Sequence, residues 1–256
     1  MRFVELEEAR AARGLRVVIA TNVPSPWSQA VLGVLDMKGL DALVVRFRRN
    51  DDEIKRWTGT RNAPVALYDD EPPRAGWAEI VALAERLGGH VSLVPTDDER
   101  RVRMFGLSHE ILGEGGLGWS ARLLLTHASL VTDGRDGWPK PVAEYLAPRY
   151  GYTPERVDEA RSRAIGVLRL LDRVLGESRA RGHDYFLGAA PTALDVHAAT
   201  VLAPLLPMPE SECPMPSPVR HAFETIDRDV RDAVSPALVE HRAMMFARHL
   251  VLPVRF

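Results

Sequence analysis

"ATNVPSPWSQAVLGVLDMKGL", residues 20–40, is the stretch that decides the fold of this 256-residue chain. The apolar run at residues 15–20 that leads into it is typical of a strand covered on both faces. From Trp27 onward the apolar residues keep helical spacing, and Gly39 stands where a glycine commonly ends a helix. The stretch therefore predicts a strand, a short loop and a helix that begins at Ser25 and Pro26.

The first third of the chain continues this alternation of strand and helix. Apolar runs predict further strands at residues 42–47 and 63–69, and the helix between the first two strands makes those two parallel. A short helical turn is expected at 51–59 and an amphipathic helix at 76–89. Residues 70–74 leave room for one short strand, and its two prolines confine it to a sheet edge.

After residue 95 the pattern predicts helices only. Thr96 and Glu99 form a capping box, and Thr192 with Asp195 forms a near capping box before a helix that is apolar nearly all round. That helix is expected to be the buried centre of its domain. Residues 113–118 are rich in glycine and predict a break between helices. The last helix is expected from Ser235 to about residue 250.

Composition excludes several classes of function. A net charge of −2 disfavours nucleic acid as a partner. The apolar runs are too short for a membrane helix, and the acidic N-terminus shows no secretory signal. The single cysteine, Cys213, excludes a disulfide framework and a Cys-x-x-Cys pair, and the histidines show no metal-ligand spacing. We therefore expect a cytoplasmic protein that binds no metal.

Three segments carry a resemblance to a known family. They are Ser25-Pro26-Trp27-Ser28, Ala63-Pro64-Val65 and "YFLGAAPTALDVHAATVL" at residues 185–202. In this order they resemble the glutathione S-transferase superfamily, in its serine-type form. The resemblance implies an α/β thioredoxin-like domain over residues 1–90, with a short N-terminal extension of about residues 1–14. An all-α domain over residues 96–256 follows it.

Ser25 is the candidate catalytic residue that the resemblance implies. The bare N–H groups and the positive end of the helix dipole favour an anion there, and a serine hydroxyl can donate to the thiolate sulfur of glutathione. Ser25 would stabilise this anion and would not act as a nucleophile. A serine followed by proline is also a preferred start of a helix, so the residues alone leave both roles open.

Two further parts of a glutathione site are implied by the resemblance. Ala63 and Pro64 correspond to a turn whose proline is cis, and the backbone of Ala63 would pair with the cysteinyl part of glutathione. Where family members place Glu-Ser to hold the γ-glutamyl group, this chain has Arg74-Ala75-Gly76-Trp77. Arg74 could bind a carboxylate there, and Trp77 occupies the place of the serine. The γ-glutamyl site is therefore degenerate.

The resemblance also implies a co-substrate pocket between the domains, with Trp27, His109 and Trp119 as its candidate walls. We expect a protein that uses glutathione thiolate on a small electrophile and forms a homodimer. The alternative is a catalytically silent protein of the same fold that binds a ligand or another protein. Gly76-Trp77 favours the alternative, and the intact Ser25-Pro26-Trp27-Ser28 favours the enzyme.

Overall fold

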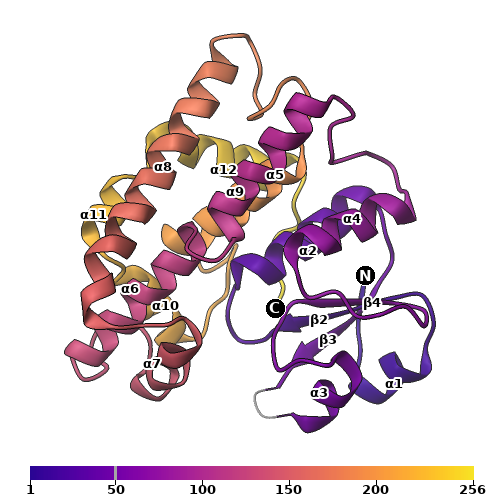
Figure 1. Ribbon diagram of the computed structural model, residues 1–256, viewed down its shortest axis with the longest axis horizontal. Coiled ribbons are helices and arrows are strands. Elements are labelled where there is room, and N and C mark those ends of the chain that lie inside the picture. Colours follow the sequence, from indigo (N-terminus) through magenta and orange to yellow (C-terminus); the bar gives the residue numbers. More distant parts are fainter. Residues whose placement is uncertain (49–50) are drawn as a thin grey trace.

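The computed structural model of the protein describes residues 1–48 and 51–256. A small sheet with helices on both faces comes first in the chain, and a larger all-helical part follows it (Figure 1). This confirms the predicted combination of a thioredoxin-like α/β domain and an all-α domain. Within the described ranges, no helix has the length and apolar character needed to cross a membrane.

The described residues form a four-stranded mixed sheet in the order β1-β3-β2-β4. The central strand β2 pairs in parallel with β3 and antiparallel with β4. Helices α2 and α4 cover one face of the sheet, and α1 and α3 cover the other (Figure 1). Alternate residues of β2 enter two separate cores, Val17 and Ile19 on one side and Val18 on the other. The elements are β1 (Arg2–Phe3), α1 (Leu6–Ala11), β2 (Leu15–Ala20), α2 (Pro26–Lys38), β3 (Leu43–Phe47), α3 (Asp52–Thr58), β4 (Val65–Tyr68) and α4 (Trp77–Leu87).

Two parts of this domain differ from the simple sequence pattern. The first 14 residues, expected as an extension, contain β1, which pairs with β3, and α1, which buries Leu6 and Ala9. Elements this short give no periodic signal and depend on tertiary contacts. Around residues 70–74 the described chain forms only an isolated bridge between Ala66 and Arg74, because the neighbouring prolines have no N–H to extend a ladder.

The helical part is built around α9, which is buried along its whole length, as predicted. It packs against α2 of the first domain and against α5 and α12 of its own. The elements are α5 (Asp98–Leu112), α6 (Leu117–Val131), α7 (Lys140–Leu146), α8 (Val157–Arg179), α9 (Ala193–Leu205), α10 (Ser217–Glu224), α11 (Arg228–Asp232) and α12 (Pro236–Arg248), with short 3₁₀ turns at Ala147–Arg149 and Pro154–Arg156.

The helix boundaries largely follow the predicted caps. Ser235 caps α12 by accepting the N–H of Leu238, and the glycine-rich segment separates α5 from α6, both as expected. The predicted cap at Thr96 is wrong by one residue. The carboxylate of Asp97 accepts the N–H of Arg100 at 2.8 Å, so α5 begins after Asp97.

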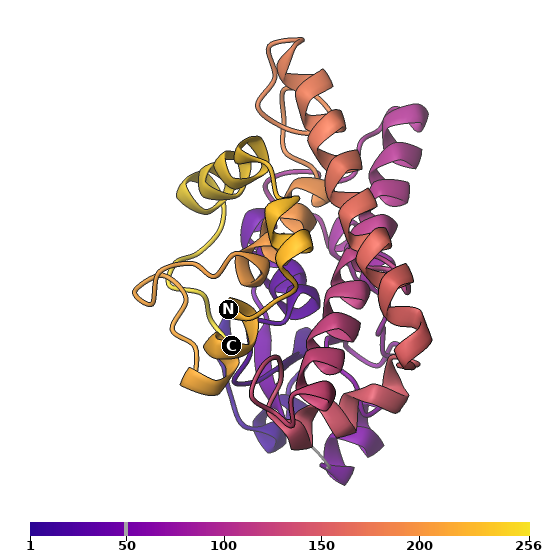
Figure 2. The same ribbon diagram turned by 90° about the vertical axis from the view of Figure 1, so that its left-hand side faces the viewer.

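The segment after α12 returns to the first domain and lies along α2 (Figure 2). The side chain of Leu250 packs so closely on Gly33 that a Cβ there would lie 2.8 Å from it. The carbonyl of Arg255 accepts a hydrogen bond of 2.7 Å from Gln29, and its guanidinium pairs with Asp36. This segment therefore joins the helical part to α2.

Candidate functional site

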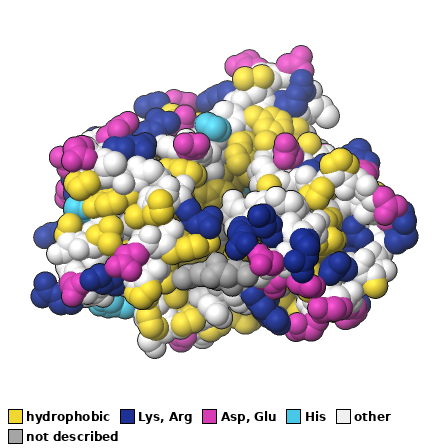
Figure 3. Space-filling model, turned by 60° about the horizontal axis from the view of Figure 1, so that its bottom comes forward, with side chains coloured by type: hydrophobic (Ala, Val, Ile, Leu, Met, Phe, Trp, Pro, Cys, Tyr) yellow, Lys and Arg dark blue, Asp and Glu magenta, His cyan; other side chains and the backbone are white. Residues whose placement is uncertain are grey.

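A cavity of about 510 Å³ lies between the two domains. Its first-domain wall is the loop after β2 and the end of β3, and its other wall comes from α6, α7 and α10. Figure 3 shows hydrophobic side chains gathered in the hollow between the two halves of the molecule, with basic side chains near its edge. The lining residues are Ala20, Thr21, Asn22, Val23, Phe47, Arg48, Arg122, Trp138, Pro139, Val142, Tyr145, Leu146 and Val219.

The lining of the cavity is apolar apart from a few side chains. Its polar members are Thr21, Asn22, Arg48, Arg122 and Tyr145, and no Asp or Glu stands among the described lining residues. A volume of this size falls in the range of about 300–1,000 Å³ that small-molecule sites occupy. The cavity can therefore hold a small molecule, and its charged groups are basic.

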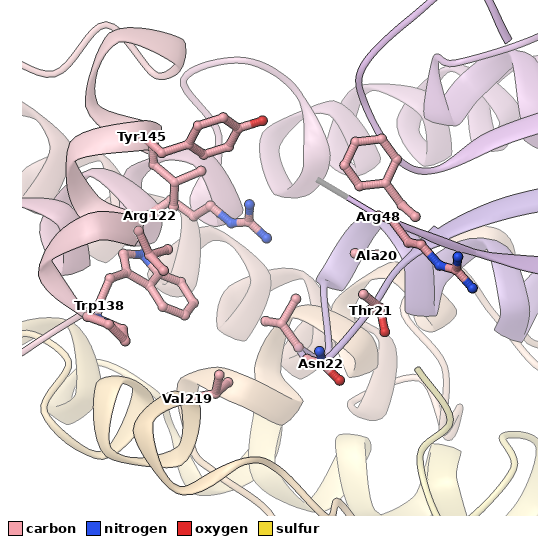
Figure 4. A pocket seen from close by; sticks show the side chains of 13 residues that line it. Ala20, Thr21, Asn22, Arg48, Arg122, Trp138, Tyr145 and Val219 are labelled. Atoms are coloured by element: carbon pink, nitrogen blue, oxygen red, sulfur yellow. The ribbon is translucent and has the colours of Figure 1, made fainter. Parts of the chain in front are cut away.

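Arg122 projects from α6 into this cavity (Figure 4). Its Nη1 donates to the hydroxyl of Tyr150 at 2.9 Å. Its guanidinium carbon lies 4.9 Å from the ring of Trp27, 5.5 Å from that of Tyr150 and 6.0 Å from that of Trp138. In the part of the chain that the structure describes, no carboxylate pairs with it. Aromatic faces, not a counter-charge, hold the guanidinium in place.

Ser25 lies at the N-cap position of α2, where the sequence analysis placed it, and is only 2% exposed. Its hydroxyl makes no capping hydrogen bond, and no hydrogen bond joins it to any other described residue. Ser28 has the structural role instead, because its Oγ accepts the N–H of Ala20 at 3.0 Å and ties α2 to β2. Ser25 therefore begins the helix without using its side chain as a cap, and its role toward glutathione remains a prediction.

The Ala63–Pro64 bond is cis, as the resemblance implies. Ala63 is half-buried, and Pro64, directly before β4, is buried. The role of Ala63 in binding a peptide remains a prediction.

The polar groups at and just before the start of α4 already form ion pairs or hydrogen bonds within the chain. Arg74 pairs with Glu71 at 2.6 Å, and Glu71 also accepts from Arg86. Hydrogen bonds from Arg86 and then Arg74 lower the pKa of the Glu71 carboxyl below its usual value. The N–H of Gly76 donates to Oε2 of Glu79 at 3.2 Å. A ligand carboxylate at this place would compete with both internal carboxylates.

Trp77 packs between the domains. Its ring centroid lies 6.1 Å from that of Phe105 on α5 and 5.5 Å from that of His197 on α9. His197 is buried, its Nδ1 lies 2.9 Å from Oγ of Ser108, and burial lowers its pKa to about 3. The neutral imidazole is therefore part of this packing, and a binding role for Trp77 remains a prediction.

The three predicted wall residues lie outside the lining of the large cavity. The ring of Trp27 contacts the lining residue Arg122, and its Nε1 donates to the carbonyl of Leu112 at 2.7 Å. His109 is exposed on α5 beside Gly113. Trp119 lies 4.4 Å from the ring of Tyr150 and lines a separate small hollow. Sequence reasoning missed Arg122 because a single arginine on a helix ordinarily indicates a solvated surface.

Comparisons with known proteins show which fold the chain has. A scan against models of protein families gives no match, and a search of curated proteins gives none. Solved structures do match over nearly the whole chain. A glutathione S-transferase from Methylobacterium radiotolerans, in complex with glutathione sulfonate, is 21% identical, with a TM-score of 0.60 and coverage of 91% of each chain.

Two further structures agree. A glutathione S-transferase from Methylobacillus flagellatus with glutathione bound is 14% identical, with a TM-score of 0.61 over 92% of this chain and 96% of its own. A glutathione transferase Omega 3C from Trametes versicolor is 16% identical, with a TM-score of 0.61 over 97% of this chain and 92% of its own. Both similarities extend through the sheet domain and the helical domain, so this protein has the fold of the glutathione S-transferases.

Proposed function

We propose that the protein is a glutathione-transferase-like enzyme of the serine type. It binds glutathione at the start of α2 and uses the thiolate on a small electrophile held in the interdomain cavity. The observation that carries this proposal is the hydroxyl of Ser25, which stands at the N-terminus of a 13-residue helix without a hydrogen-bond partner in the described chain. Similar structures with bound glutathione or glutathione sulfonate support the choice of ligand.

The chemistry needs glutathione as an anion near neutral pH. A free cysteine thiol has a pKa of about 8.5, and a helix N-terminus with a positive partner or donor lowers that value. The dipole of α2 places about half a positive charge at its first turn, and no acidic residue of that turn opposes it. The hydroxyl of Ser25 donates to the sulfur. The thiol proton passes to solvent, and a sulfur lone pair then forms the bond to the electrophilic carbon as the leaving group takes its bonding electrons.

A second candidate function has its own support. Arg74 and the N–H of Gly76 are matched with Glu71 and Glu79, and Trp77 is packed between Phe105 and His197. These contacts favour a protein that keeps the fold and the cavity but binds a ligand other than glutathione and catalyses nothing. The enzyme remains our first proposal because the hydroxyl of Ser25 stands at the N-terminus of α2 with no hydrogen-bond partner among the described residues.

Calorimetric titration with glutathione and S-hexylglutathione separates the two candidates. We expect saturable binding of both by the wild type. Ser25→Ala should weaken the binding of glutathione about 10-fold or more above pH 8, because a hydrogen bond to a charged group is lost. The affinity for S-hexylglutathione should fall much less, since its thioether carries no charge. Ser211→Ala, an exposed serine far along the chain, is the matched control.

If neither ligand gives heat with protein shown to be folded, the enzyme proposal fails and the second candidate stands. We also propose that the domains divide between residues 90 and 96 and that the protein is a cytoplasmic homodimer. Light scattering after size-exclusion chromatography tests the oligomeric state.

A further inference from the structure

The positive charge of Arg122 lacks a negative partner in the described chain. A guanidinium has five N–H donors, and the structure pairs only Nη1, with the hydroxyl of Tyr150 at 2.9 Å. The rings of Trp27, Tyr150 and Trp138 lie within the range of about 6 Å over which a cation is attracted to an aromatic face. They fix the position of the guanidinium without neutralising its charge.

The second basic residue among the described lining residues, Arg48, differs from Arg122 because it has a carboxylate partner and is exposed. Arg48 pairs with Glu5 at 2.7 Å, and the two side chains are 68% and 76% exposed. In Figure 4 the guanidinium of Arg48 points away from that of Arg122. Among the described lining residues, the positive charge without a carboxylate partner is therefore that of Arg122, which is half-buried.

A half-buried guanidinium with unused N–H groups favours an anionic ligand. Polar groups withdrawn from water are unfavourable until a partner satisfies them, and a carboxylate can accept two parallel N–H bonds from one arginine. In Figure 4 the guanidinium points into the cavity from the α6 side, toward the loop that carries Thr21 and Asn22. The carboxylate of a ligand in the cavity can therefore accept hydrogen bonds from the end of the guanidinium.

The remaining walls determine the rest of the ligand. Eight apolar residues from both domains line the cavity. A polar peptide would leave its amide groups without partners there, whereas a hydrocarbon or aromatic body would be well matched. The apolar residues are Ala20, Val23, Phe47, Trp138, Pro139, Val142, Leu146 and Val219.

We propose that the interdomain cavity binds a small monocarboxylate with an apolar or aromatic body, and that Arg122 holds its carboxylate. That this ligand is the electrophilic co-substrate rests on the proposed function; the binding itself does not. Glutathione also carries carboxylates, but the apolar walls favour a second ligand as the source of the carboxylate that Arg122 binds.

The test compares an acid with its uncharged amide. Phenylbutyrate and phenylbutyramide are titrated into the full-length wild type, with and without saturating glutathione. The wild type should bind the acid about 10-fold or more tightly than the amide, because the acid forms charge-assisted hydrogen bonds. Arg122→Gln should bind the two equally. Arg173→Gln, an exposed arginine on α8, should keep the wild-type preference.

Arg122→Lys keeps the charge but loses the planar fork, so it should retain part of the preference and guards against a folding defect in Arg122→Gln. Equal binding of acid and amide by the wild type would overturn the proposal, as would no binding of either. Loss of the preference in Arg48→Gln but not in Arg122→Gln would overturn it too. If Arg122→Gln weakens the binding of glutathione but not that of phenylbutyrate, the carboxylate that Arg122 binds belongs to glutathione and the proposal is wrong. Failure of glutathione to bind the wild type leaves the comparison of acid and amide intact.

Discussion

Nε2 of His241 on α12 lies 2.9 Å from Oδ1 of Asp195 on α9, and both side chains are completely buried. The same carboxylate accepts the N–H of Phe186 at 3.0 Å and, through Oδ2, the N–H and hydroxyl of Thr192. Asp195 thus connects the start of the central helix, the preceding loop and α12. One acidic side chain organises the centre of the helical domain.

Replacing Asp195 by Ala should lower the free energy of unfolding by about 3–5 kcal/mol, because several buried polar groups lose their partner. Urea denaturation followed by circular dichroism measures this loss. The control is Asp184→Ala, which removes an exposed ion pair with Arg248 and should cost about 1 kcal/mol or less. Equal losses in the two variants would show that the buried network contributes nothing special.

Lowering the pH should reduce the free energy of unfolding, in part because of His197. Burial lowers its pKa to about 3 in the folded protein, whereas the unfolded chain has an ordinary value near 6.5. Between these values the unfolded state binds the extra proton, so the stabilisation is complete above about pH 6.5 and is lost as pH falls toward 3.

In His197→Asn the decline in stability below about pH 6.5 should be shallower than in the wild type, by up to about 1.4 kcal/mol per pH unit for one proton. Urea midpoints at several pH values between neutrality and about pH 4 give the two slopes. Parallel slopes would mean that His197 is accessible to protons in the folded state.

Replacing Ser25 or Ser28 by Ala should affect different properties, the pKa of the glutathione thiol for Ser25 and the stability of the fold for Ser28. Ser28→Ala leaves the N–H of Ala20 without its acceptor and should cost about 1–3 kcal/mol of stability. Ser25→Ala should leave stability nearly unchanged, because its hydroxyl bonds to no described residue, but should raise the pKa of bound glutathione. Thermal melts and the ultraviolet absorbance of the thiolate as a function of pH report the two properties. An unchanged thiol pKa in Ser25→Ala would remove Ser25 from the proposed mechanism.

The contact between Leu250 and α2 should contribute strongly to stability. Leu250 is 8% exposed against Gly33, so Leu250→Ala leaves a cavity and should cost about 2–5 kcal/mol. Its neighbour Val251 is 43% exposed, and Val251→Ala should change stability by about 0.5 kcal/mol or less. Chemical denaturation of both variants checks the contrast. A small effect at Leu250 would mean that the segment is not firmly attached to α2.

Much of the fold could be predicted from local patterns. The buried run at residues 15–20, the glycine at position 39 in a left-handed conformation and the break between α5 and α6 are each where the sequence analysis placed them. These features depend on neighbouring residues, so periodicity and turn chemistry suffice. The start of α9 was also predicted, although the hydroxyl of Thr192 binds the carboxylate of Asp195 and not a backbone N–H.

The resemblance implies a pocket between the domains, but the residues that line the cavity could not be predicted from local patterns. The guanidinium of Arg122 is held by aromatic rings from α2, from the segment before α7 and from the turn that follows α7. These rings come together only through tertiary packing. The internal partners of Arg74 and Gly76 were equally invisible, since hydrogen bonds between side chains leave no periodic trace. The sequence thus offers candidates at the start of α2, whose role in binding remains a prediction, and it gives no signal for the cavity wall that carries Arg122.

The segment that carries Leu250 and Arg255 has a consequence for the order of folding. During synthesis α2 emerges from the ribosome long before its covering, because Gln29 and its partner Arg255 are separated by 226 positions. Domains tend to fold in the order in which they are made. One side of the helix that begins at Ser25 therefore stays uncovered until residues 250–255 have been made, and a nascent chain stalled before them would expose that side to chaperones.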